Sequence, residues 1–156
     1  MFDIMSNIIY ITRMSPMSFR EKSAWISFIS IALVSSIYFS KIVLVLVTGR
    51  GRGAAAYVFL GLVALLIVLE VGLHIAIAMQ APHEARTPKD ERERLIEMKA
   101  TRIAFPVLLV SVFAAIGTLH LPGSSRFLMA DAILLAIVIG QLTRFGAQIV
   151  YHRRGF

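Results

Sequence analysis

Cysteine is absent from the sequence. Its absence excludes a disulfide framework, a catalytic thiolate and a metal site built from thiolate ligands. Charged residues are scarce as well, at 16% of the chain, where soluble domains have about a quarter. The glycine-rich segment 49–53 follows an apolar run and no predicted strand, so it is not a nucleotide-binding loop, and no cofactor is expected.

Apolar residues dominate instead, at 58% of the chain with a mean hydropathy of +0.78. A helix needs about 20 mostly apolar residues to cross a ~30 Å hydrocarbon core. Four stretches meet this length, at residues 24–47, 54–79, 103–121 and 127–150. The intervening turns, 48–53 and 121–125, are short and contain Gly or Pro, which favours antiparallel neighbours. We therefore predict an all-α integral membrane bundle of four transmembrane helices over residues 24–150.

Basic residues are unevenly distributed outside the predicted spans. Most lie in the N-terminal segment 1–23, the loop 80–102 and the tail 151–156, and few lie at the two short turns. Because Lys and Arg stay on the cytoplasmic side, both termini are predicted to be cytoplasmic, and the net charge of +7 does not indicate a nucleic-acid partner. The N-terminus lacks signal-peptide features, so the first span is expected to be retained, with Met14 or Met17 as alternative starts.

The loop before the third span contains a second helix signal. In the segment 87–105, Thr87 suits an N-cap, Pro88 suits the first helical position, and opposite charges recur three or four residues apart. We predict a cytoplasmic amphipathic helix that leads into the third span. It is either a solvated surface helix or a docking face for a cytoplasmic partner, and the predicted contact face consists of Asp90, Glu91, Arg94 and Glu97.

Polar residues inside the spans carry the main functional hypothesis. Ionisable groups in hydrocarbon cost roughly 2.5–3.5 kcal/mol and usually face a partner or a cavity. At about 1.5 Å per residue, four such residues fall in one layer of the inner half of the membrane: Glu70, His74, Gln141 and Arg144. We predict a buried Glu70–Arg144 ion pair, with His74 and Gln141 completing its hydrogen bonds. The cluster is structural, a proton or substrate site, or a metal site; no third metal ligand is evident, and no metal is predicted.

The same calculation of depth from helix rise predicts an outer-leaflet pair between Lys41 and Asp131. Alternatively, the Lys41 side chain extends to the membrane interface by itself. Rows of small residues, which allow helices to approach closely, occur in the first and fourth spans. These rows predict helix contacts or a dimer interface and consist of Ala32, Ser36 and Ser40, and of Ala132, Ala136 and Gly140. His83, His120 and His152 lie near span ends or in the loop and are expected to be interfacial.

Three segments together resemble a group of small four-span bacterial proteins with a domain of unknown function. These segments are LEVGLHIAIA in the second span, PKDERERLIEMKATRIAF before the third, and QLTRFGAQIVYHRRGF at the end. The resemblance covers roughly residues 18–156. It implies a bacterial inner-membrane protein with four spans and supplies no catalytic residues.

Two function classes remain, and a third is less favoured. The favoured hypothesis is a non-enzymatic multi-pass membrane protein: an accessory, sensor or structural component that forms a homodimer or contacts a membrane or cytoplasmic protein. The alternative is a small proton-coupled transporter that works as a dimer around Glu70. A membrane enzyme with Glu70 and His74 as acid and base requires a substrate pocket that the sequence does not indicate.

Overall fold

The computed structural model describes residues 18–49, 55–80, 82, 88–120 and 126–154. Four long helices account for most of them: α2 (Phe19–Thr48), α3 (Ala55–Gln80), α5 (Glu91–Gly117) and α6 (Arg126–Arg154). The 3₁₀ turn η2 (Thr118–His120) extends α5. Each helix is long and apolar enough to cross a membrane, so the prediction of an all-α fold with four candidate spans is confirmed.

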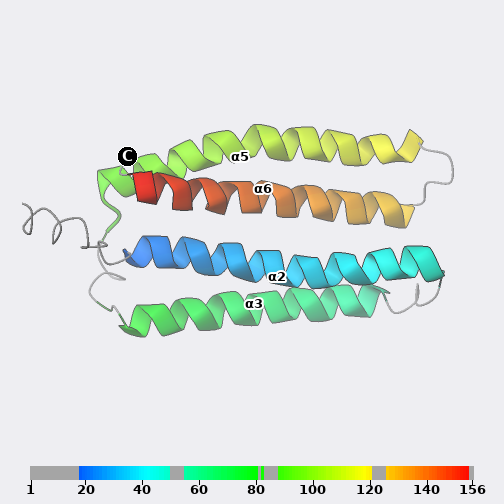
Figure 1. Cartoon of the computed structure of the whole chain (residues 1–156), viewed down its shortest axis with the longest axis horizontal. Coiled ribbons are helices and arrows are strands. Elements are labelled where there is room, and N and C mark those ends of the chain that lie inside the picture. The colour runs from blue at the N-terminus through cyan, green and yellow to red at the C-terminus, as the bar shows by residue number, and fades with distance from the viewer. Residues whose placement is uncertain (1–17, 50–54, 81, 83–87, 121–125, 155–156) are drawn as a thin grey trace, which may run out of the picture.

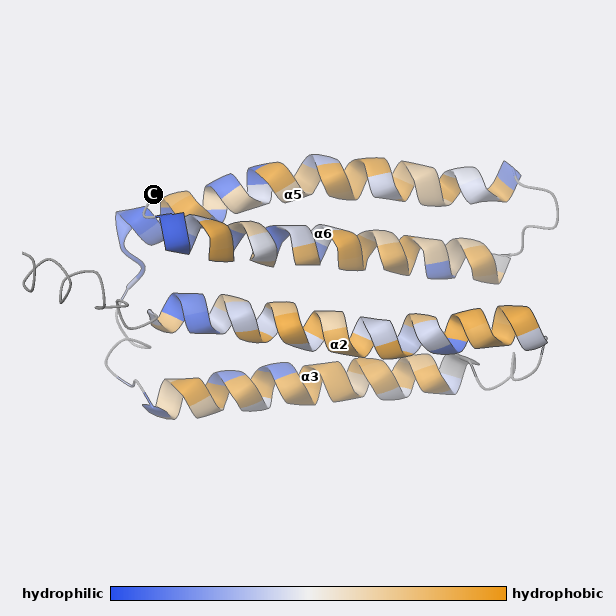
Figure 2. Cartoon of the chain, viewed as in Figure 1, coloured by the Kyte–Doolittle hydropathy of each residue, from blue (hydrophilic) through white to orange (hydrophobic). Residues whose placement is uncertain are grey.

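The helices are longer than a bilayer requires. At about 1.5 Å per residue, the 30 residues of α2 measure ~45 Å, whereas the hydrocarbon core is ~30 Å thick. The excess carries most of the charge. Figure 2 shows hydrophilic residues gathered at the end where α2 and α5 begin and α6 ends, and apolar residues along the remaining lengths. Polar side chains of this end therefore lie at or beyond the membrane surface.

Local caps fix where the helices begin and end. The Ser18 hydroxyl accepts a hydrogen bond from the backbone N–H of Glu21 at 3.1 Å and caps α2. Gly49 closes the same helix in a left-handed conformation, with φ 68°, which a residue without a Cβ adopts at low cost. Asp90 caps α5 through a side-chain contact with the N–H of Glu91 at 2.8 Å.

One prediction about the segment before the third span is wrong, and one agrees only in part. The long helix begins at Glu91 and its cap is Asp90, not Thr87, which lies outside the described residues. The charged segment does lead into the third span, because α5 continues without interruption from Glu91 into the apolar part, but the structure does not show it as an amphipathic cytoplasmic helix. Its acidic side chains pair with α2 and α6, which holds the segment parallel to the spans.

The helices lie in the order α5, α6, α2, α3 across the molecule (Figure 1). The outer members are α5 and α3, and each packs against one of the two central helices. Along the α2–α6 contact, Phe28 packs against Gly146, and the antiparallel directions place Glu21 opposite Arg153. The order follows from the two short turns, which make α2–α3 and α5–α6 hairpins, joined along α2 and α6.

Small residues make the closest helix contact, between α5 and α6. Gly140 approaches Leu108 so closely that a Cβ added at Gly140 would lie 3.0 Å from its side chain, and Ala136 is buried. The predicted small-residue row of α6 is therefore a helix contact. The row predicted in α2 is not, because Ser36 and Ser40 are exposed. The sequence analysis missed the buried alanines of α5, which are Ala100, Ala104 and Ala115.

Candidate functional site

A polar seam runs between α2 and α3 in the charged half of the molecule. We define it by four residues: Ser23 and Ser27 on α2, and Glu70 and His74 on α3. Both pairs are four residues apart, so each pair occupies one helix face. Because the helices are antiparallel, the two faces meet in register: the Ser23 oxygen lies 2.9 Å from Nε2 of His74, and the Ser27 hydroxyl donates to Oε2 of Glu70 at 2.9 Å.

The hydrogen bonds of His74 determine its tautomer. Nδ1 lies 2.7 Å from the backbone carbonyl of Glu70. A carbonyl can only accept, so Nδ1 carries a proton, and in the neutral ring Nε2 accepts from the Ser23 hydroxyl. Nδ1 also lies 3.4 Å from Oε2 of Glu70. The ring thus connects a serine hydroxyl with a carboxylate through its two nitrogens.

The predicted Glu70–Arg144 ion pair is wrong. Arg144 instead contacts Oε1 of Glu97 on α5 at 3.2 Å, and Glu70 contacts α2. Since α2 lies between α3 and α6, the α3 and α6 axes are roughly 16–20 Å apart, twice the usual interaxial distance of 8–10 Å. Matched depth was not sufficient, because side chains cannot reach across an intervening helix.

Gln141, the fourth member of the predicted cluster, is half-buried on α6 and makes no side-chain hydrogen bond with the described residues. The structure therefore divides the cluster between two places. Glu70 and His74 belong to the α2–α3 seam, and Arg144 belongs to a charged assembly at the helix ends. Among the described residues, no group of three or more His, Asp or Glu could hold a metal ion.

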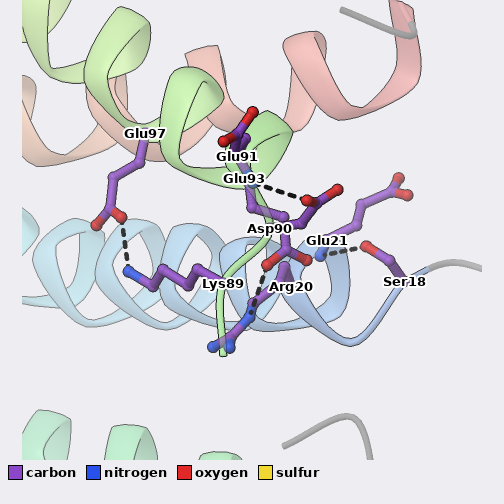
Figure 3. A network of polar contacts seen from close by, with 8 residues as sticks. All are labelled: Ser18, Arg20, Glu21, Lys89, Asp90, Glu91, Glu93 and Glu97. Atoms are coloured by element: carbon purple, nitrogen blue, oxygen red, sulfur yellow. Dashed lines mark hydrogen bonds and ion pairs between the residues drawn. The ribbon is translucent and has the colours of Figure 1, made fainter. Parts of the chain in front are cut away.

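The charged assembly joins α2, α5 and α6 near the end where α2 and α5 begin and α6 ends. Oε2 of Glu97 accepts from Nζ of Lys89 at 2.6 Å, and its other oxygen contacts Arg144. Arg20 lies 3.4 Å from Glu93. Figure 3 shows Lys89 reaching Glu97, with Arg20 beneath the first turn of α5. The acidic residues of α5 therefore pair mainly across helices, and Lys89 contacts Glu97, eight residues away, and not a residue three or four positions along.

A pocket of about 150 Å³ opens within this assembly. Its wall combines cations, carboxylates and neutral polar groups from α2, α5 and α6 and the residues before α5. The lining residues are Arg20, Ser23, Ala24, Lys89, Glu93, Ile96, Glu97, Arg144, Phe145, Gln148 and His152. Ser23 belongs both to this wall and to the α2–α3 seam, so the two polar regions are continuous.

The predicted cytoplasmic contact face is divided. Asp90 caps α5, and Glu97 pairs with Lys89 and Arg144. Glu91 and Arg94 are exposed, and their side chains form no hydrogen bond or ion pair with other described residues. Only these last two members remain available to a partner.

The half of the bundle away from the charged assembly contains a different polar contact from the predicted one. Asp131 accepts a hydrogen bond from the Tyr38 hydroxyl at 2.6 Å, whereas Lys41, one turn further along α2, is exposed. The predicted Lys41–Asp131 pair is therefore wrong. Tyr38 is 9% exposed and its ring contacts Phe59 of α3, so it joins three helices.

The sequence analysis missed Ser23, Ser27 and Tyr38 as site residues. A signal for the serines was present: Ser23 and Ser27 have the same four-residue spacing as Glu70 and His74, in the helix joined to α3 by a short turn. Hydroxyls in a span also need partners, since lipid offers none. Tyr38 had no comparable signal, because an aromatic residue in a span is usually packing material.

Comparison with known protein families matches residues 38–156 to a family described as "Predicted membrane protein (DUF2178)". The match includes α3, α5, α6 and the last third of α2. No curated protein and no solved structure shows significant similarity to the chain.

Proposed function

Because the chain belongs to the DUF2178 family of predicted membrane proteins, a family of unknown function, we propose its role from its own geometry. We propose that it is a non-enzymatic multi-pass component of a bacterial inner membrane, with both termini in the cytoplasm. Its role is that of an accessory or sensor protein, and the cytoplasmic end of α5 (Glu91–Gly117) contacts a cytoplasmic protein partner.

The observation that carries this proposal is the way the end of α5 is held. Residues 91–102 precede the apolar span and measure ~18 Å. Glu93 and Glu97 anchor this extension to α2 and α6 through Arg20 and Arg144. Contact with a partner at the exposed extension would therefore be transmitted to two central helices, as a sensor or accessory subunit requires.

The order Ser23, His74, Glu70 is also that of a hydrolase triad, and its geometry argues against this chemistry. The closest acceptor of the His74 Nδ1–H is the backbone carbonyl of Glu70 at 2.7 Å, with the carboxylate further away at 3.4 Å. Ser23 lies within α2, where backbone N–H groups bond along the helix and do not form an oxyanion hole. Labelling of Ser23 by a fluorophosphonate would contradict the non-enzymatic proposal.

Two sets of variants test the partner contact. The double variant Glu91→Gln/Arg94→Gln changes exposed, uncoupled side chains and should abolish a discrete cross-link formed in cells by a photoreactive residue at Leu95. Glu97→Gln removes ion pairs that face the other helices, so it should keep the cross-link and lower the free energy of unfolding by about 1 kcal/mol.

The matched control places the photoreactive residue at Phe113, which is 70% exposed within the apolar span and should yield lipid adducts only. A cross-link at Leu95 that survives the double variant, or the absence of any protein adduct there, contradicts the proposed contact.

A second candidate function, a small proton-coupled transporter that works as a dimer around Glu70, is favoured by one observation. Within the described part of the chain, no Lys or Arg contacts Glu70, so no fixed cation holds its charge. Glu70→Gln should then stop the collapse of a pH gradient across proteoliposomes, measured with an entrapped dye. Glu91→Gln is the control, and equal collapse rates in both variants remove this candidate.

A further inference from the structure

The polar seam and the pocket form one chain of contacts. Ser23 lines the pocket, its oxygen lies 2.9 Å from Nε2 of His74, and Nδ1 of the same ring lies 3.4 Å from Oε2 of Glu70. We propose that Ser23 and His74 form a proton path between the cytoplasmic-end pocket and the Glu70 carboxylate. This inference deepens the second candidate function and rests on Glu70 exchanging a proton.

The pocket provides the cytoplasmic terminus of the path. A polar space of about 150 Å³ accommodates several water molecules, which need polar partners to be ordered. Ser23 is among the residues that line this space. The charged and titratable groups that surround this terminus come from α2, α5, α6 and the segment before α5, and they are Arg20, Lys89, Glu93, Glu97, Arg144 and His152.

The membrane terminus of the path is the Glu70 carboxylate, which is positioned to exchange a proton with His74. Ser27 donates to Oε2 of Glu70 and fixes the carboxylate toward His74. Ser27 is 5% exposed, so it positions the group without connecting it to solvent. Oε1 of Glu70 is buried with no hydrogen-bond partner among the described residues, which is a costly state for a polar atom. The titratable neighbour of Glu70 on the seam is His74.

One proton passes in two steps. A hydronium ion in the pocket gives a proton to Oγ of Ser23 and is left as water, while the Ser23 O–H proton moves to Nε2, which forms an imidazolium with both nitrogens protonated. The Nδ1–H bond then breaks as the proton bonds to Oε2 of Glu70, after a side-chain rotation that shortens the 3.4 Å separation. The imidazole is left neutral and the carboxylic acid forms. The reverse sequence returns the proton to the pocket and restores the first tautomer.

The test follows protonation of Glu70 in nanodiscs by infrared spectroscopy after a pH jump. The carboxylic acid band that Glu70→Gln removes is assigned to Glu70. In His74→Phe the band should appear with roughly 10²-fold slower kinetics, in the range that positioned proton transfer contributes. In Ser23→Ala, where water can partly replace the hydroxyl, we expect about tenfold slower kinetics. The final amplitude should be retained in both.

Ser35→Ala is the matched control, because the Ser35 hydroxyl bonds to carbonyls of its own helix and lies outside the path. Its kinetics should equal those of the unsubstituted protein. Unchanged kinetics in Ser23→Ala and His74→Phe overturn the path, and Ser23→Ala alone decides if His74→Phe does not fold. The absence of any Glu70 band overturns the proton site itself. If the infrared kinetics depend on Ser23 and His74 as expected but the pH gradient across proteoliposomes does not collapse, only the transporter function is contradicted.

Discussion

Tyr38 connects three of the four helices through one side chain. Its hydroxyl bonds to Asp131 of α6, and its ring contacts Phe59 of α3. It is buried within the apolar part of the bundle, where an unpaired carboxylate has no water to bond. The stability of the central helix pair therefore depends on this hydrogen bond as well as on packing.

Tyr38→Phe should lower the free energy of unfolding by about 1–3 kcal/mol, because it leaves a carboxylate oxygen without its donor while retaining the ring. Tyr57→Phe is the same chemical change at a residue that is 78% exposed, and it should have an effect within about 0.5 kcal/mol. Unfolding by sodium dodecyl sulfate in mixed micelles measures both. Equal effects of the two variants would show that the bond to Asp131 contributes nothing.

At the scale of residues, the sequence analysis found the polar groups and not their partners. Glu70, His74, Arg144 and Asp131 all make polar contacts, as the cost of burying them in lipid demands. Their depths could be calculated from helix rise alone. Their partners depend on helix rotation and order, which rise does not determine, and serine and tyrosine hydroxyls compete with the charged groups that were considered.

The contact between α5 and α6 is the closest of the helix pairs because Gly140 has no side chain. The backbone of α6 approaches Leu108 at this point, and the buried alanines of α5 belong to the same small-residue packing. In lipid, van der Waals contact between helices replaces the hydrophobic effect as the main source of association. This pair consequently forms the most tightly packed element of the protein.

Gly140→Leu should separate α5 from α6 and destabilise the protein by about 1–3 kcal/mol, the usual effect of overpacking. Gly61→Leu is the control: Gly61 lies in the apolar part of α3 with open space around it, so a side chain there meets lipid. Unfolding in mixed micelles and the efficiency of a cysteine cross-link between α5 and α6 report the two effects. If Gly61→Leu lowers the free energy of unfolding by the same amount, the effect of Gly140→Leu does not come from the packing of α5 against α6.

The extents of the elements were predictable where hydrophobic length dominates and less so where charges pair. The predicted span 127–150 lies within α6, and the span 24–47 lies within α2. The structure extends both helices into their charged ends. The largest difference is at α5, whose extension packs along its neighbours because Glu93 and Glu97 pair with cations there, whereas charge spacing within the segment favoured an amphipathic helix at the membrane surface.

The arrangement of the whole molecule was only partly predictable. Two short turns determine the α2–α3 and α5–α6 hairpins, and the structure confirms both neighbours. Which helices join the two hairpins could not be derived from the sequence. All four spans have an apolar surface, and in lipid the hydrophobic effect does not favour one helix pairing over another. The contact of α2 with α6 depends on particular matches, such as Phe28 with Gly146 and Tyr38 with Asp131.

The central place of α2 has a consequence for how the protein is made. This helix leaves the ribosome first of the four, yet the acceptor for its Tyr38 hydroxyl is Asp131, more than ninety residues later. Until the fourth span has entered the bilayer, the Tyr38 hydroxyl of the first span lacks its acceptor. Assembly is therefore complete only when the last helix has inserted. A chain truncated after the third span would leave Tyr38 without its acceptor, and α2 and α5 without the helix that both of them contact.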